Sequence, residues 1–196
     1  MPQVKGLKER IVAGQATKEK MSECDFFIQW HLTERCNLHC SHCYQGETKK
    51  NEMSLSELKK VVEEVSDTLK SWAETYGIKF LPSFNVTGGE PFLRKDLFEI
   101  LGETSKKGFD IYLLSNGALI NKQKAERLSA LDVKGVQVSI EGPENVHDKI
   151  RGKGSFALSA KGIKNLLESN IKVTLNVTLS NLNTEYVRDL ISFASS

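Results

Sequence analysis

The chain has 196 residues, of which 39% are apolar and 27% charged, and its formal net charge is +2. This balance excludes a nucleic-acid binder that works by neutralising phosphates, and the composition excludes a wholly disordered chain. No apolar run approaches the roughly 18 residues of a membrane helix, and the N-terminus lacks the hydrophobic stretch of a secretory signal. We therefore expect a cytoplasmic protein with one compact core and neither a membrane nor a nucleic-acid partner.

The predicted elements alternate between strands and helices. A strand is expected over residues 26–32, and Ser54 with Glu57 forms a capping-box pair that begins a long amphipathic helix ending at Gly77. The later elements are strands at 80–87, 110–115, 135–140 and 172–179, with helices at 96–106, at 121–130, from the N-cap Ser155 and from about 183. This order predicts an α/β fold with parallel strands and crossover helices.

Four of the five predicted strands alternate apolar and polar residues. Val136, Val138 and Ile140, for example, alternate with Gln137 and Ser139. Because successive side chains point to opposite faces, each strand has one apolar face for the helices and one polar face. Unpaired polar groups would cost roughly 1–3 kcal/mol each in a dry interior. We therefore expect an incomplete, wide barrel around a polar ligand cavity; the alternative is a sheet with one face open to solvent.

Three of the four cysteines lie within eight residues, directly after the first predicted strand. Cys36, Cys40 and Cys43 can hold three corners of a soft-metal site. Structural zinc would need a fourth protein ligand, such as a nearby histidine or the distant Cys24. A four-iron cluster held by three cysteines would instead leave one iron open for a substrate or cofactor. The spacing leaves both possibilities open, and Cys24 is expected to be a buried apolar residue.

Several motifs around these cysteines resemble one family. Residues 30–44 read W-H-L-T-E-R-C-N-L-H-C-S-H-C-Y, similar to the W-x-L-T-x-x-C-N-L-x-C-x-x-C-Y form of the radical S-adenosylmethionine (radical SAM) enzymes. Residues 87–91 match the family's G-G-E-P motif, and residues 115–117 resemble its T-N-G or S-N-G motif. Residues 139–152 resemble the S-x-D-G…H-D…R-G segment of SPASM-type peptide and cofactor maturases and sulfatase-maturating enzymes. The resemblance covers about residues 26–180.

The resemblance implies an oxidoreductase or maturase. Cys36, Cys40 and Cys43 would ligate a [4Fe-4S] cluster, whose fourth iron would chelate the amino and carboxylate groups of S-adenosylmethionine. An electron from a reductant such as flavodoxin or ferredoxin would cleave a C–S bond, and the resulting 5′-deoxyadenosyl radical would abstract a substrate hydrogen. The expected substrate is a peptide or protein side chain, or a small peptide-derived cofactor precursor. The alternatives are a tetrapyrrole-side-chain enzyme of haem biosynthesis and a non-catalytic zinc- or cluster-holding module.

The same resemblance assigns residues to the cofactor. Gly88 and Gly89 lack Cβ atoms, so their backbone can approach a ligand closely, and Glu90 would accept a hydrogen bond from the cofactor's ammonium group. The other implied contacts are Ser139 to the ribose or carboxylate, Arg151 to the carboxylate and His42 beside the adenine, with Ser115 and Asn176 as secondary candidates.

Two features depart from the family pattern. Glu141 stands where this branch usually has Asp. The family barrel has six βα units, whereas five are visible here, so we expect residues 25–196 to be a partial (β/α) barrel, truncated before the sixth unit or completed by another chain. Residues 1–24 are expected to be an N-terminal extension.

Overall fold

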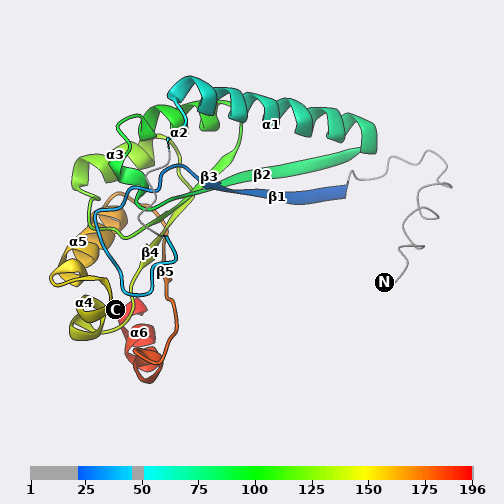
Figure 1. Ribbon diagram of the computed structural model, residues 1–196. Coiled ribbons are helices and arrows are strands. Elements are labelled where there is room, and N and C mark those ends of the chain that lie inside the picture. Colours follow the sequence, from blue (N-terminus) through cyan, green and yellow to red (C-terminus); the bar gives the residue numbers. More distant parts are fainter. Residues whose placement is uncertain (1–21, 46–50, 196) are drawn as a thin grey trace.

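The computed structural model describes residues 22–45 and 51–195. Five parallel strands form one sheet in the order β1-β2-β3-β4-β5, and helices cover its outer face (Figure 1). The strands are β1 (Ser22–His31), β2 (Ile78–Thr87), β3 (Asp110–Ser115), β4 (Gly135–Ser139) and β5 (Val173–Asn176). The α-helices are α1 (Leu55–Tyr76), α2 (Leu97–Lys106), α3 (Lys122–Ala130), α4 (Glu144–Arg151), α5 (Ser155–Glu168) and α6 (Val187–Ala194), with short 3₁₀ helices η1 (Pro91–Leu93) and η2 (Thr184–Tyr186). The predicted α/β partial barrel is confirmed.

The two faces of the strands differ as the alternation predicts. Trp30 is 9% exposed, and Phe84 and Val138 are fully buried, where they face the helices and form part of the core. Gln29 and Gln137, on the opposite face, are exposed and half-buried respectively. The helices therefore take up the apolar faces, and the polar faces are left to line the concave side of the sheet.

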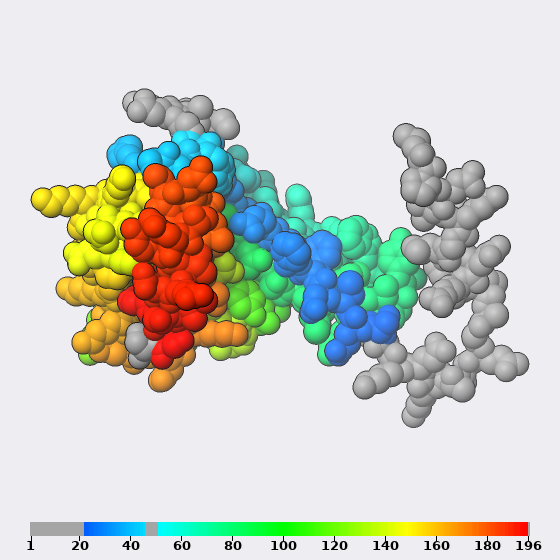
Figure 2. Space-filling model, turned by 90° about the horizontal axis from the view of Figure 1, so that it is seen from below, coloured from blue at the N-terminus to red at the C-terminus, as the bar shows by residue number. Residues whose placement is uncertain are grey.

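The first halves of β1 and β2 extend beyond the other strands. These two strands pair from Ser22 opposite Ile78 onward, whereas β2 and β3 pair only from Ser83 opposite Asp110. The resulting ribbon, covered by α1, projects from the body of the molecule (Figures 1 and 2). Residues 22–24, which we assigned to the extension, thus belong to β1; the rest of that extension lies outside the described residues.

Local signals fix the ends of α1 as predicted. The Ser54 hydroxyl accepts a hydrogen bond from the Glu57 backbone N–H at 3.4 Å, and the Glu57 carboxylate accepts one from the Ser54 N–H at 2.7 Å. Gly77 ends the helix with φ of 62°, a left-handed conformation that glycine adopts without steric cost.

The start of α5 differs from its prediction by one residue. Its N-cap is Gly154, and Ser155 is the first helical residue. The carboxylate of Asp148 in α4 accepts hydrogen bonds from the backbone N–H groups of Gly154 and, at 2.9 Å, Phe156. A side chain from the preceding helix therefore satisfies N–H groups that a helix start leaves without partners.

The prediction that Cys24 is buried is wrong, and Trp72, on the helix that covers the same ribbon, is exposed as well. Cys24 lies on the projecting ribbon and is exposed. Trp72 is 42% exposed, although its ring lies 6.2 Å from that of Phe26 and 6.4 Å from that of Phe80. Both lie where the sheet is only two strands wide, so less of the protein surrounds them. Among the described residues, no helix is long and apolar enough to cross a membrane.

Candidate cofactor site

A cavity of about 240 Å³ lies at the carboxyl ends of the strands, the edge where parallel α/β sheets bind ligands. Cys36, Cys40 and Cys43 line it from the segment after β1, and Gly88 and Gly89 line it from the end of β2. The other predicted residues in its wall are His42, Ser115, Ser139, Arg151 and Asn176. Glu90, alone among the predicted site residues, is not part of the lining.

Backbone hydrogen bonds shape the cysteine-bearing segment. The Cys43 N–H donates to the Cys40 carbonyl at 3.0 Å, which turns the chain between these two thiols. The Ser41 N–H donates to the Ile150 carbonyl at 2.8 Å, which fastens the same turn to α4. Two thiols are thus positioned by an element more than 100 residues away in the sequence.

The donor set fits an iron–sulfur cluster. Burial raises the pKa of the Cys36 and Cys40 thiols, while Asn116 at the first and Arg151 at the second act to lower it. Bound iron would supply the positive charge that stabilises the thiolates. Among residues 22–45 and 51–195, no three Cys, His, Asp or Glu side chains are close enough to hold a single metal ion. In a cluster, by contrast, each thiolate holds a separate iron.

The glycine pair lets the end of β2 pack directly against the segment after β1. The Gly89 N–H donates to the Thr33 carbonyl at 2.7 Å, and the Glu90 N–H donates to the Arg35 carbonyl at 2.8 Å. A Cβ on Gly88 would lie 2.5 Å from the Thr33 oxygen, and one on Gly89 would lie 2.3 Å from the Arg35 oxygen. Any larger residue would push the two strand ends apart.

Glu90 has a different setting from the one we predicted. Its side chain is fully buried, and its carboxylate accepts hydrogen bonds from the Ser115 hydroxyl (2.9 Å) and from the backbone N–H groups of Asn116 (2.8 Å) and Phe92 (3.2 Å). Burial raises its pKa, and these hydrogen bonds oppose the rise. The carboxylate therefore joins the ends of β2 and β3 and does not reach the cavity as an acceptor for an ammonium group.

Arg151 reaches the cysteines from the end of α4. Its Nε donates to Glu141 at 2.8 Å, and its Nη1 lies 3.8 Å from the Cys40 sulfur. Glu141 is fully buried and also accepts a hydrogen bond from the Thr178 N–H at 3.0 Å, while His42 Nε2 lies 3.5 Å from its Oε1. The glutamate that departs from the family pattern thus orients Arg151 and connects β4, α4 and the chain after β5.

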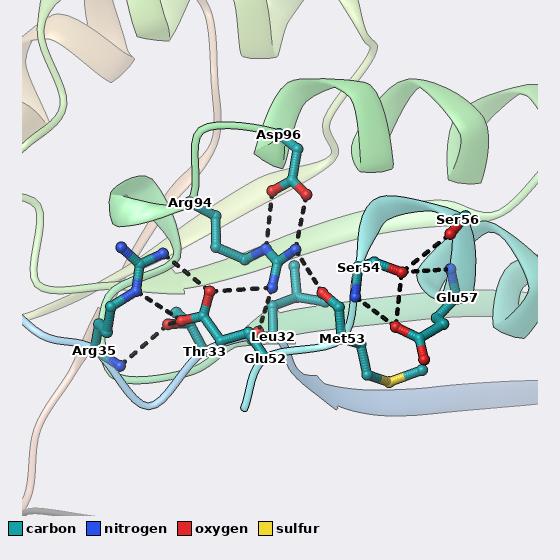
Figure 3. A network of polar contacts seen from close by, with 10 residues as sticks. All are labelled: Leu32, Thr33, Arg35, Glu52, Met53, Ser54, Ser56, Glu57, Arg94 and Asp96. Atoms are coloured by element: carbon teal, nitrogen blue, oxygen red, sulfur yellow. Dashed lines mark hydrogen bonds and ion pairs between the residues drawn. The ribbon is translucent and has the colours of Figure 1, made fainter. Parts of the chain in front are cut away.

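A buried arginine that sequence reasoning missed holds both ends of the cysteine-bearing segment (Figure 3). The Arg94 side chain is 4% exposed and makes two hydrogen bonds to Asp96, at 2.9 and 2.8 Å. It also donates to the Leu32 carbonyl at 3.1 Å and to the Met53 carbonyl at 3.0 Å. One guanidinium therefore fixes the chain before the first cysteine and the chain after the last.

Glu52 adds a second connection in the same network (Figure 3). It accepts hydrogen bonds from Arg35 at 2.7 and 3.0 Å and from the Thr33 hydroxyl, and lies 3.4 Å from Arg94. Hydrogen bonding by Arg35 lowers the pKa of the Glu52 carboxyl. No motif or periodicity in the sequence singles out Glu52 or Arg94, because only the fold brings them together.

His147 is a buried histidine beside this site. It is fully buried, its Nδ1 accepts a hydrogen bond from the Glu141 N–H at 3.2 Å, and its Nε2 has no partner among the described residues. Burial, aided by the charge of Arg151, lowers its pKa to about 4. The ring is therefore neutral at pH 7, with its proton on Nε2.

The stability of the protein should fall in acid because of His147. As the pH drops below about 6.5, the His147 ring is protonated in the unfolded chain, whereas in the folded chain it stays neutral down to about pH 4. The free energy of unfolding therefore falls by about 3 kcal/mol between these two pH values. We expect denaturant titrations of His147→Gln to show a correspondingly weaker pH dependence than the wild type, whereas His39→Gln, at an exposed position, keeps the wild-type slope. Equal slopes for both variants would contradict this assignment.

The fold and the site together define a class: a parallel α/β partial barrel that gathers three thiols and a glycine pair around one cavity at its carboxyl edge. The chain belongs to the radical SAM superfamily, since the profile described as Radical SAM superfamily matches residues 30–194. Members of this superfamily use a [4Fe-4S] cluster and S-adenosylmethionine. The three cysteine thiols described above fit such a cluster.

Proteins of known function resemble most of this chain in sequence, and proteins of known structure resemble it in fold. It is 35% identical over 167 residues to the Fe-coproporphyrin III synthase of Methanosarcina barkeri, covering 83% of this chain and 38% of that protein. It is 31% identical over 159 residues to the mycofactocin maturase MftC of Mycobacterium ulcerans, covering 79% and 41%. Streptococcus suis SuiB bound to precursor peptide SuiA has a similar fold, with a TM-score of 0.68, 17% identity and coverage of 88% and 37%. The chain thus spans about two fifths of these proteins' lengths.

Proposed function

We propose that this chain is the catalytic core of an enzyme that cleaves S-adenosylmethionine reductively and abstracts hydrogen from a substrate. Cys36, Cys40 and Cys43 would hold the [4Fe-4S] cluster, and Gly88 and Gly89 would present their backbone to S-adenosylmethionine. When bound, these groups supply a 5′-deoxyadenosyl radical. The observation that carries the proposal is that all five residues line one cavity.

The remaining residues in the cavity wall would bind and orient S-adenosylmethionine. Ser139 and Asn176 lie opposite each other on β4 and β5 and supply a hydroxyl and an amide. Arg151 supplies positive charge for a carboxylate, although Glu141 already holds its Nε. Ser115, whose hydroxyl donates to Glu90, would act mainly by fixing the end of β3.

We further propose that the substrate is a peptide or a peptide-derived precursor. Several strand positions that face the concave side carry neutral amides or hydroxyls: Gln29, Asn85, Gln137 and Thr174. Such groups match the N–H and C=O groups of a peptide. Two relatives support the same class, because one is a mycofactocin maturase and the other binds a precursor peptide.

A tetrapyrrole is the second candidate substrate. The observation that favours it is the 35% identity to a Fe-coproporphyrin III synthase. A coproporphyrin carries several carboxylates, which proteins bind with Arg or Lys. In the described cavity wall, Arg151 is the sole Arg or Lys. One cation is too few for several carboxylates, so a peptide is the substrate we propose first.

The proposal includes a one-electron reductant such as flavodoxin or ferredoxin and a location in the cytoplasm. Four free cysteines among the described residues accord with a reducing compartment.

The experiment that tests both the activity and the substrate class measures the transfer of deuterium from a labelled substrate to 5′-deoxyadenosine. The protein is purified anaerobically, reduced with dithionite, and given S-adenosylmethionine with either a deuterated peptide digest of the source cells or deuterated iron coproporphyrin. We expect 5′-deoxyadenosine to form and to gain deuterium from the peptides. Deuterium from the tetrapyrrole alone would replace the substrate assignment, and the absence of 5′-deoxyadenosine would overturn the proposed activity.

A further inference from the structure

Asn116 follows β3 and contacts the first cysteine of the site. Its side-chain Nδ2 lies 3.8 Å from the Cys36 sulfur and donates a hydrogen bond to Asn37 Oδ1 at 2.9 Å. A side-chain amide has two N–H donors, so these two partners use both. Asn116 therefore has no N–H left to offer a cofactor or substrate.

The orientation of this amide is fixed. The Ala118 N–H donates to Asn116 Oδ1 at 2.9 Å, which identifies the oxygen end of the amide and turns the nitrogen end toward Cys36. The Asn116 backbone is held as well, because its N–H donates to Glu90 at 2.8 Å and its carbonyl accepts from the Ser159 hydroxyl at 2.6 Å. The residue is 5% exposed, so solvent does not compete for its contacts.

In the part of the chain that the structure describes, the Cys36 sulfur has two N–H donors nearby, whereas the Cys40 sulfur has one. Cys36 also has the Leu38 backbone N–H at 3.5 Å, and Cys40 has Arg151 Nη1 at 3.8 Å. Arg151 is also a candidate for binding S-adenosylmethionine, so its replacement would alter two contacts together. Asn116 offers the cleaner test, since its two N–H groups are confined to Cys36 and Asn37.

We propose that Asn116 is a positioning residue that raises the reduction potential of the cluster through an N–H···S hydrogen bond to Cys36. The inference rests on the proposed function, because it requires that Cys36 bind iron. Hydrogen bonds to the sulfurs are among the factors that set iron–sulfur potentials. A donor stabilises negative charge on sulfur, and the reduced cluster carries more of it, so this contact makes reduction easier.

The test measures the midpoint potential of the reconstituted cluster by EPR-monitored redox titration in the wild type, Asn116→Ala, Asn116→Ser and Asn37→Ala. Serine keeps a polar group in the wall but is too short to replace the amide. We expect reduction to become about tenfold less favourable in both Asn116 variants, which equals about 59 mV for one electron. Asn37→Ala removes the neighbouring acceptor and leaves the donor to sulfur, so its potential should match the wild type.

The possible results separate this inference from the proposed function. If the wild-type protein takes up no cluster, the proposed function fails first. If the cluster forms but both Asn116 variants keep the wild-type potential, or Asn37→Ala shifts it equally, the tuning role is wrong. Failure of both Asn116 variants to load a cluster, while Asn37→Ala loads one, would also overturn it, because three thiolates should hold the cluster without this contact.

Discussion

Replacing Gly89 with Ala is expected to lower the rate of S-adenosylmethionine cleavage by about 100-fold, the cost of displacing a reacting group by about 1 Å. The new Cβ would lie 2.3 Å from the Arg35 carbonyl oxygen and 2.8 Å from that of Glu34. Both are backbone atoms, so relief requires the segment after β1 to move. That movement would carry the cysteines away from the end of β2.

A matched control for this substitution is available in α2. Gly102 has Leu131 Cδ2 at 3.9 Å as its nearest neighbour, an ordinary contact, so Gly102→Ala creates no clash. Alanine should instead stabilise the helix by roughly 0.5–1 kcal/mol. The measurements are 5′-deoxyadenosine formation and cluster content in both variants. Full activity in Gly89→Ala would show that the close approach of the two strand ends is not required.

Replacing Glu141 with Ala should produce the largest loss of stability, about 3–5 kcal/mol, which is typical when one partner of a buried ion pair is removed. Arg151, whose side chain is 11% exposed, would lose its partner. The N–H of Thr178 and the side chain of Asn183, which lies 3.5 Å from the carboxylate, would lose an acceptor. Denaturant titration of the free energy of unfolding measures the effect.

Two variants make the comparison specific. Glu141→Gln keeps an oxygen that can accept from Thr178 but removes the negative charge. Its free energy of unfolding should therefore fall by less than that of the alanine variant. Glu126→Ala removes an exposed partner, 57% accessible and 4.0 Å from Lys122, and should cost less than about 0.5 kcal/mol. Equal losses for Glu141→Ala and Glu126→Ala would contradict the role of Glu141 as a buried connection.

The parts of the fold that depend on local signals were predictable. Ser54 and Gly77 fixed α1 because a capping hydroxyl and a left-handed glycine act within one turn. The alternation along the strands likewise predicted which faces are buried, since it depends only on the period of a strand. The start of α5 was misplaced because its capping group, Asp148, comes from another helix.

The site was predictable where its chemistry is confined to a motif. The cysteines and the two glycines lie together as their motifs indicate. Glu90 could not be placed, because the direction of its carboxylate depends on donors at the end of β3, 25 residues later. Arg94 and Glu52 gave no signal for the same reason, because the contact between them joins residues 42 apart in the sequence.

The central claim is that Cys36, Cys40 and Cys43 together hold a four-iron cluster, and iron analysis with Mössbauer spectroscopy of single cysteine variants tests it most directly. The wild type and Cys24→Ala, whose thiol lies exposed on the ribbon, should both carry about four irons per chain. Alanine at any one of the other three should abolish the cluster. A wild-type iron content in those three variants, or its loss in Cys24→Ala, would contradict the account.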